Sequence, residues 1–153
     1  ALAWRSLLRV ITAAGADAQG EIALDMYLQQ VREVWTGYAL ELVDYRHECM
    51  LLRGWDALFL QANEHAGGLR AMSASPHYRV FEEEARMWED RLARIQTVFD
   101  LWADVQRQWV YLHGVFGSGS AERMMHILPV ESTRFQSMSS EFLALLKKVL
   151  NSP

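Results

Sequence analysis

The feature that most constrains this chain is a stretch from about residue 76 to residue 116 in which large apolar residues recur every seven positions. No glycine or proline interrupts it between Phe81 and His113, and Glu82 stands four residues before Arg86, an order that favours a helix. The pattern predicts one long amphipathic helix that forms the spine of the fold. The heptad positions hold Phe81, Trp88, Ile95, Trp102, Trp109 and Phe116, and the positions four residues after the first three hold Ala85, Leu92 and Phe99.

The apolar face of this helix changes in its second half. There the positions that would complete the heptad are polar, at Gln106 and His113, whereas Val98, Val105 and Leu112 are apolar. Because a straight helix drifts by about 20° per heptad, we expect the second half to pack in a different direction from the first. The alternative is a coiled-coil arm, although three tryptophans along the face favour a broad partner surface over a zipper.

Two helical patterns precede the spine at the N-terminal end. Residues 1–18 predict a short helix or a frayed flanking segment that ends in a stretch of small residues near Gly15. A second amphipathic helix is predicted from about Gly20 to Gly37. Its apolar positions are Leu24, Leu28, Val31, Trp35 and Tyr38.

A hairpin and another helix are predicted between residue 39 and the spine. Residues 39–53 hold short apolar clusters around a polar centre, which predicts a two-stranded hairpin. A helix opens at Trp55, and Ser75 and Pro76 are suited to be the N-cap and first residue of the spine helix.

The C-terminal part follows a Gly/Ser turn after Phe116. It predicts a short helix from Ala121 to Ile127 and a last amphipathic helix that begins at Pro129. The predicted fold class is therefore mainly α: an elongated helical bundle built on one long central helix, with one small β-hairpin. We expect Trp102 and Trp109 to be largely buried in it.

Composition and motifs argue for a scaffold without catalytic, cofactor or metal residues. A net charge of −4 argues against a nucleic-acid surface, and no apolar run is long enough for membrane insertion. No G-x-x-x-x-G-K-[ST] loop is present, and no glutamate stands three residues before a histidine as di-iron bundles require. The single Cys49 excludes an internal disulfide framework and offers no clustered zinc ligands.

Two runs of residues resemble a known family. Trp102 to Phe116 is similar to the W-x-x-x-Q-x-x-W-x-Y-L-x-x-I-F signature of dynein heavy chains, and Leu128 to Phe135 resembles the L-P-x-E-x-x-R-F element that follows it there. His113 stands where cytoplasmic members usually have an acidic residue. The residues expected to form the structural signature are Trp88, Ile95, Phe99, Trp102, Gln106, Trp109, Tyr111, Leu112, Phe116, Leu128, Pro129, Glu131 and Phe135.

Three upstream runs, Val31–Trp35, Leu52–Asp56 and Val80–Glu83, are similar to the cytoplasmic branch of that family. The resemblance covers residues 19–153, which we expect to be one helical linker segment, and leaves residues 1–18 outside it.

The resemblance implies the linker, a helical lever between the cargo-binding tail and the AAA+ ring. It implies no catalytic site or cofactor in this segment, with ATP or ADP and Mg bound by AAA+ modules elsewhere in the heavy chain. The implied partners are the ring and the remaining linker of the same chain, and through the parent protein the dynein complex subunits and microtubules. The implied location is the cytoplasm, on the cytoskeleton. The alternative, from another class, is a passive spectrin-like tethering bundle.

Overall fold

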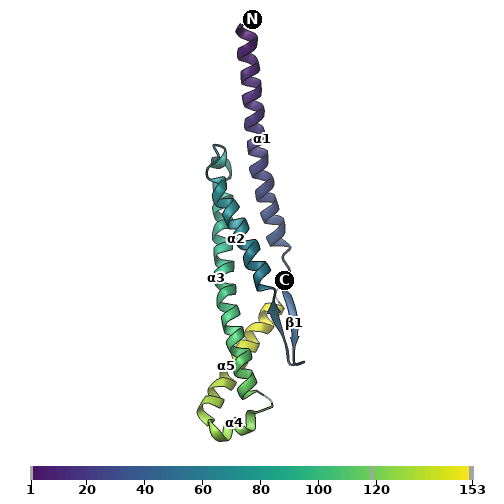
Figure 1. The fold of residues 1–153 in the computed structure, drawn as a ribbon, viewed down its shortest axis with the longest axis vertical. Coiled ribbons are helices and arrows are strands. Elements are labelled where there is room, and N and C mark those ends of the chain that lie inside the picture. The colour runs from purple at the N-terminus through teal and green to yellow at the C-terminus, as the bar shows by residue number, and fades with distance from the viewer. Residues whose placement is uncertain (1, 118, 152–153) are drawn as a thin grey trace. The chain divides into compact units, whose positions relative to one another are not determined.

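The computed structural model describes residues 2–117 and 119–151, except that the side chains of residues 2–14 and 16 lie outside the description. The chain is mainly α with one small hairpin, which confirms the predicted fold class (Figure 1). The elements are α1 Leu2–Thr36, β1 Glu41–Tyr45, β2 Cys49–Arg53, α2 Trp55–Met72, α3 Tyr78–Phe116, α4 Ala121–Ile127 and α5 Pro129–Leu150.

The chain divides into two compact units, and the spine helix α3 belongs to both. The first unit contains α1, α2 and α3 as far as Thr97. The second contains the hairpin, α3 from Val98 onward, α4 and α5. Each unit has an apolar core of its own.

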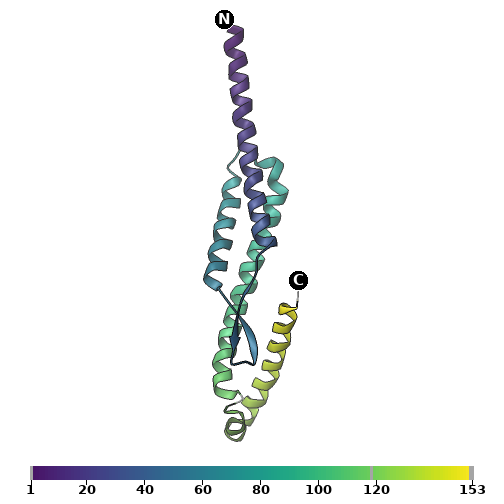
Figure 2. The same ribbon diagram turned by 90° about the vertical axis from the view of Figure 1, so that its right-hand side faces the viewer.

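In the first unit, the C-terminal part of α1 lies beside α2 and the N-terminal half of α3, and the rest of α1 extends past them (Figures 1 and 2). Their apolar faces meet as amphipathic helices require, because burial of those faces stabilises helices that are marginal alone. The buried residues of this core are Leu28, Val31, Leu69, Met72, Ala85, Trp88 and Leu92.

The N-terminal helix differs from its prediction. The structure has one continuous helix, α1, where the sequence predicted a short segment to residue 18 and a second helix from Gly20. The alanines around Gly15 are strong helix formers and offset its cost, so the small residues do not end the helix. At Gly20 a Cβ atom would lie 2.7 Å from the His77 ring, which explains a glycine at this close approach.

The start of α3 also shifts slightly. The helix begins at Tyr78, two residues after the predicted first residue Pro76. Ser75 still acts at this terminus, because its Oγ accepts a hydrogen bond from the His77 N–H at 3.3 Å and its carbonyl accepts one from the Tyr78 N–H at 3.2 Å.

In the second unit the predicted hairpin is confirmed as an antiparallel pair in which Leu42 lies opposite Leu52. Its turn holds Arg46 and His47 at positive φ, 54° and 59°, and the Glu48 N–H bonds the Tyr45 carbonyl at 3.0 Å. Consecutive left-handed residues give the twist that tight hairpins favour, although side chains other than glycine make that conformation costly.

Candidate functional site on the long helix

The core of the second unit is built around one tryptophan of α3. Trp109 is 4% exposed, its ring centroid lies 5.1 Å from that of Phe142, and its Nε1 donates to Ser139 Oγ at 3.0 Å. These contacts fix α5 against α3 through both ring packing and a hydrogen bond. The buried residues of this core are Leu51, Trp109, Phe135, Phe142 and Leu146.

Gln106, one turn before Trp109, holds the hairpin to α3. Its Nε2 donates to the Leu52 carbonyl at 2.7 Å, and its Oε1 accepts from the Leu52 N–H at 3.2 Å. The same oxygen accepts from Trp102 Nε1 at 3.2 Å. The side-chain amide therefore bonds the outer edge of β2 as a neighbouring strand would, and satisfies backbone groups that would otherwise be buried unpaired.

His113 forms a second polar contact to the hairpin, two turns after Gln106. Its Nε2 lies 3.0 Å from the Glu48 carboxylate and its Nδ1 lies 3.4 Å from the Tyr45 hydroxyl. Because a carboxylate only accepts, Nε2 carries a proton, and in the neutral ring Nδ1 accepts from Tyr45. The imidazole of His113 stacks on the Trp109 ring, with 4.7 Å between the ring centroids. Gly117 lies so close to His113 that a Cβ atom there would collide with its carbonyl and ring.

The first unit has a smaller polar cluster around a buried histidine. Trp35 Nε1 donates to His65 Nδ1 at 2.8 Å, and the Tyr27 hydroxyl donates to the His65 carbonyl at 3.2 Å. Burial lowers the pKa of His65 below its ordinary value, with an opposing influence from Glu64. The neutral ring is the form that accepts from Trp35.

Most of the predicted signature residues lie in or against the two cores. Trp88 is buried in the first core and Ile95 packs against it, while Phe99 is half-buried. The signature residues in or against the second core are the buried Gln106, Trp109 and Phe135 and the half-buried Trp102, Leu112 and Phe116. Burial of Trp109 was predicted correctly, whereas Trp102 is less enclosed than expected.

The other four signature residues do not join either core. Tyr111 is 72% exposed, Leu128 is 41% exposed, and Pro129 and Glu131 are exposed. Leu128 and Pro129 have a role in the backbone: Leu128 separates α4 from α5 and Pro129 is the first residue of α5, as predicted.

The expectation that Val98 and Val105 join the apolar face of α3 is wrong, whereas Leu112 of the same set packs against the second core. Val98 and Val105 are 57% and 43% exposed, whereas Gln106 and His113 are 8% and 7% exposed. The buried face therefore keeps its heptad positions, because the hairpin supplies hydrogen-bond partners for both polar side chains. Sequence reasoning missed Leu52, Glu48 and Ser139 as these partners; Leu52 acts through its backbone, which leaves no signal in residue type.

Other sites offer little chemistry. Burial is the main cause that raises the pKa of the Cys49 thiol, and the negative charges of Glu48 and Asp44 raise it further. The raised pKa disfavours the reactive thiolate. Across residues 2–117 and 119–151, no three His, Cys, Asp or Glu side chains gather closely enough to ligate a metal ion. In the same part of the chain, no helix combines the length and apolar character needed to span a bilayer.

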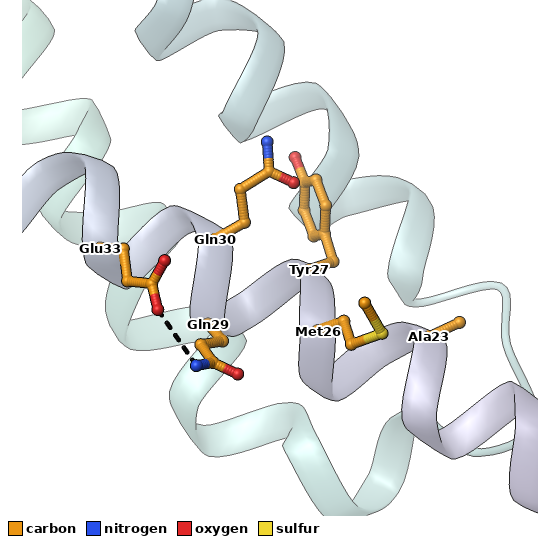
Figure 3. A pocket seen from close by; sticks show the side chains of 6 residues that line it. All are labelled: Ala23, Met26, Tyr27, Gln29, Gln30 and Glu33. Carbon is orange, nitrogen blue, oxygen red and sulfur yellow. Dashed lines mark hydrogen bonds between the residues drawn. The ribbon is translucent and has the colours of Figure 1, made fainter.

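A surface hollow lies along α1, and Figure 3 shows its side chains. Within this group only Glu33 is charged, and Gln29 Nε2 bonds its Oε1 at 3.0 Å. One helix supplies the whole lining, so no groups from different elements converge on a ligand there. The lining residues are Ala23, Met26, Tyr27, Gln29, Gln30 and Glu33.

Two cores on one uninterrupted helix, with side-chain amide and imidazole groups bonding a hairpin to it, define a helical scaffold segment. The family model for the dynein heavy chain, N-terminal region 2, matches residues 3–153. The chain belongs to this family. The match reaches into residues 1–18, which carry none of the motifs of the resemblance.

Similar proteins support the same assignment. The chain is 57% identical over 136 residues, 89% of its length, to cytoplasmic dynein heavy chains of Neurospora crassa and Drosophila melanogaster. It is 54% identical over 144 residues, 94% of its length, to that of Dictyostelium discoideum. In each case the chain spans about 3% of the relative's length.

Proposed function

We propose that this chain is a force-transmitting segment of the linker of a cytoplasmic dynein heavy chain. One observation carries the proposal: α3 continues unbroken from Tyr78 to Phe116 and contributes buried side chains to two separate cores. Each core holds its own half of α3, and the helical backbone at the boundary between the units joins the two halves. The stiffness of the helix at that boundary would therefore decide whether motion passes along α3.

The wider activity belongs to the same proposal. The heavy chain would bind ATP or ADP with Mg in AAA+ modules elsewhere, and this segment would pass their motion toward the tail as the motor moves on microtubules. The ring and the remaining linker would be its partners within the chain, in the cytoplasm and on the cytoskeleton. The segment itself would hold no nucleotide and would not be a catalytic centre.

The test softens α3 at the boundary between the units without removing a core side chain. Thr97 and Val98 are exposed and adjacent to that boundary, so Thr97→Gly with Val98→Gly lowers helix stability and spares both cores. Each glycine costs about 1 kcal/mol relative to alanine in a helix interior. In a full-length heavy chain we expect nearly normal ATP turnover with clearly slower microtubule gliding.

The matched control is Thr97→Ala with Val98→Ala, which removes the same side chains and keeps a strong helix former at both positions. It should glide at the parent speed. If the glycine variant also glides at the parent speed, α3 is outside the force path and the passive tether is the better account. Equal loss of ATP turnover and gliding would point to a folding defect instead.

A further inference from the structure

The two edges of the hairpin differ in how their backbone groups are satisfied. Gln106 bonds both the N–H and the carbonyl of Leu52 on the outer edge of β2. Because both Leu52 groups bond Gln106, they do not bond the neighbouring strand, and Leu42–Leu52 is a pair without hydrogen bonds between the strands. The N–H and carbonyl of Leu42 therefore also point outward, away from β2. Because hydrogen-bonded and non-hydrogen-bonded pairs alternate along the strand, the N–H and carbonyl of Asp44 point outward as well. Neither has a hydrogen-bond partner for these groups within residues 2–117 and 119–151.

The side chains of β1 are also open. Leu42 is 40% exposed and Val43 is 39% exposed, although they point to opposite faces of the hairpin. β1 is the outer strand of the hairpin, and no other element of the second unit runs along its free side (Figures 1 and 2). This edge lacks the lysine, proline or bulge that commonly block strand addition, and its protection consists of its shortness and the carboxylates of Glu41 and Asp44.

We infer that β1 receives an extended segment of the same heavy chain, from outside these 153 residues, as a third strand of the sheet. Strand addition would satisfy the outward groups of Leu42 and Asp44 and cover the apolar side chains of Leu42 and Val43. A sheet of three strands is also more stable than an isolated pair. The inference depends on membership of the heavy chain family and is independent of the lever role.

The charge and length of β1 select this occupant. If two copies paired antiparallel about Val43, each Asp44 would lie opposite a Leu42, which gives the carboxylate no partner on the added strand beyond the His47 that it already contacts. The added strand should instead carry a basic residue opposite Asp44, whose side chain is 47% exposed. A short edge forms few hydrogen bonds, each of small net gain, so a separate protein would dissociate readily.

A tethered segment avoids that weakness because a short linker raises its effective concentration to the millimolar range. The family supplies the necessary chain, since the sequence spans only 3% of the length of its relatives. An intramolecular third strand is therefore the occupant that the edge can hold.

The test compares backbone amide hydrogen exchange at residues 41–45 in the isolated chain and in a full-length heavy chain. The Leu42 and Asp44 amides should exchange at least about tenfold more slowly in the heavy chain, and Leu42→Pro should remove the extra protection at Asp44. Proline at residue 42 deletes an outward N–H and leaves the bonds between β1 and β2 in place. Leu42→Ala is the control, which shortens the side chain but should retain the protection.

Equal exchange in both proteins would overturn the inference. So would protection that Leu42→Pro leaves intact, since it would mean that β1 is covered by something other than a paired strand. Protection in the isolated chain that rises with its concentration would indicate pairing of two copies instead. None of these outcomes depends on gliding, so the lever proposal is tested separately.

Discussion

The two halves of α3 bury corresponding heptad positions by different means. The N-terminal half contributes Ala85, Trp88 and Leu92 to a core of apolar side chains. The C-terminal half buries Gln106 and His113 at equivalent heptad positions, where the hairpin offers backbone and side-chain partners. A polar residue in a heptad therefore marks either a solvent-facing position or a neighbour with unpaired hydrogen-bonding groups.

The two buried tryptophans show the same contrast. Trp88 Nε1 is buried without a hydrogen-bond partner among the described residues, and its ring lies under the Arg91 guanidinium, 5.0 Å from the ring centroid. Trp109 Nε1 bonds Ser139. The buried face of α3 is thus apolar in the first core, where the hydrogen bonds join α1 to α2 at His65, whereas in the second core α3 itself carries the hydrogen-bonding groups.

The largest expected effect is that of removing Trp109. Trp109→Ala should lower the free energy of unfolding by about 3–5 kcal/mol, because it leaves a cavity in the second core. Trp102→Ala should cost clearly less, since Trp102 is only half-buried. Denaturant titration followed by circular dichroism measures both. Equal costs would show that the two rings are equally enclosed in solution and that the contrast between them is wrong.

A smaller loss is expected from Gln106→Leu. Leucine keeps a similar volume but removes both bonds to the Leu52 N–H and carbonyl. At about 0.5–1.5 kcal/mol net for each bond, the variant should lose about 1–3 kcal/mol. Gln108→Leu is the matched control on the exposed side of α3 and should stay within about 0.5 kcal/mol of the parent. A Gln106 variant as stable as the control would mean that an apolar heptad position suits both halves equally.

Much of this fold could be predicted from the sequence. Heptad spacing and helix punctuation predicted the spine and α5, and short apolar clusters around a polar centre predicted the hairpin, because all of these signals are local. The exposed Val98 and Val105 were misjudged, since apolarity alone does not show whether a partner covers a residue.

The candidate site was only half predictable. Gln106 and Trp109 were identified through the resemblance, but the contact between Gln106 and Leu52 joins residues far apart in the chain and uses a backbone edge. No residue pattern records that edge. Register and tertiary packing decide which polar heptad residue is buried.

The third prediction is a pH dependence confined to the cluster in the first unit. Burial lowers the pKa of His65 in the folded state, so the unfolded state binds more protons as the pH falls below about 6.5. The contribution of His65 to stability should be complete above that value and should decrease as the pH falls toward the folded pKa. Denaturant titrations between about pH 7.5 and pH 5 measure it.

His65→Asn supplies the comparison, because asparagine offers a carbonyl oxygen to Trp35 and does not titrate. The difference in unfolding free energy between parent and variant should therefore change across that pH range. A constant difference would show that His65 titrates alike in both states and that its burial has no consequence for stability.

The smallest expected effect is a gain in stability at the turn of the hairpin. Arg46 and His47 occupy left-handed backbone that asparagine and glycine adopt more readily. Arg46→Asn with His47→Gly should therefore raise the free energy of unfolding, by about 1 kcal/mol or less. The gain is limited because His47 loses its 3.1 Å side-chain contact with Asp44, while its backbone bond to that carboxylate can remain. If the variant is less stable than the parent, the side chains at the turn stabilise the second unit by more than its backbone strain costs, and the difference between the units extends beyond their cores.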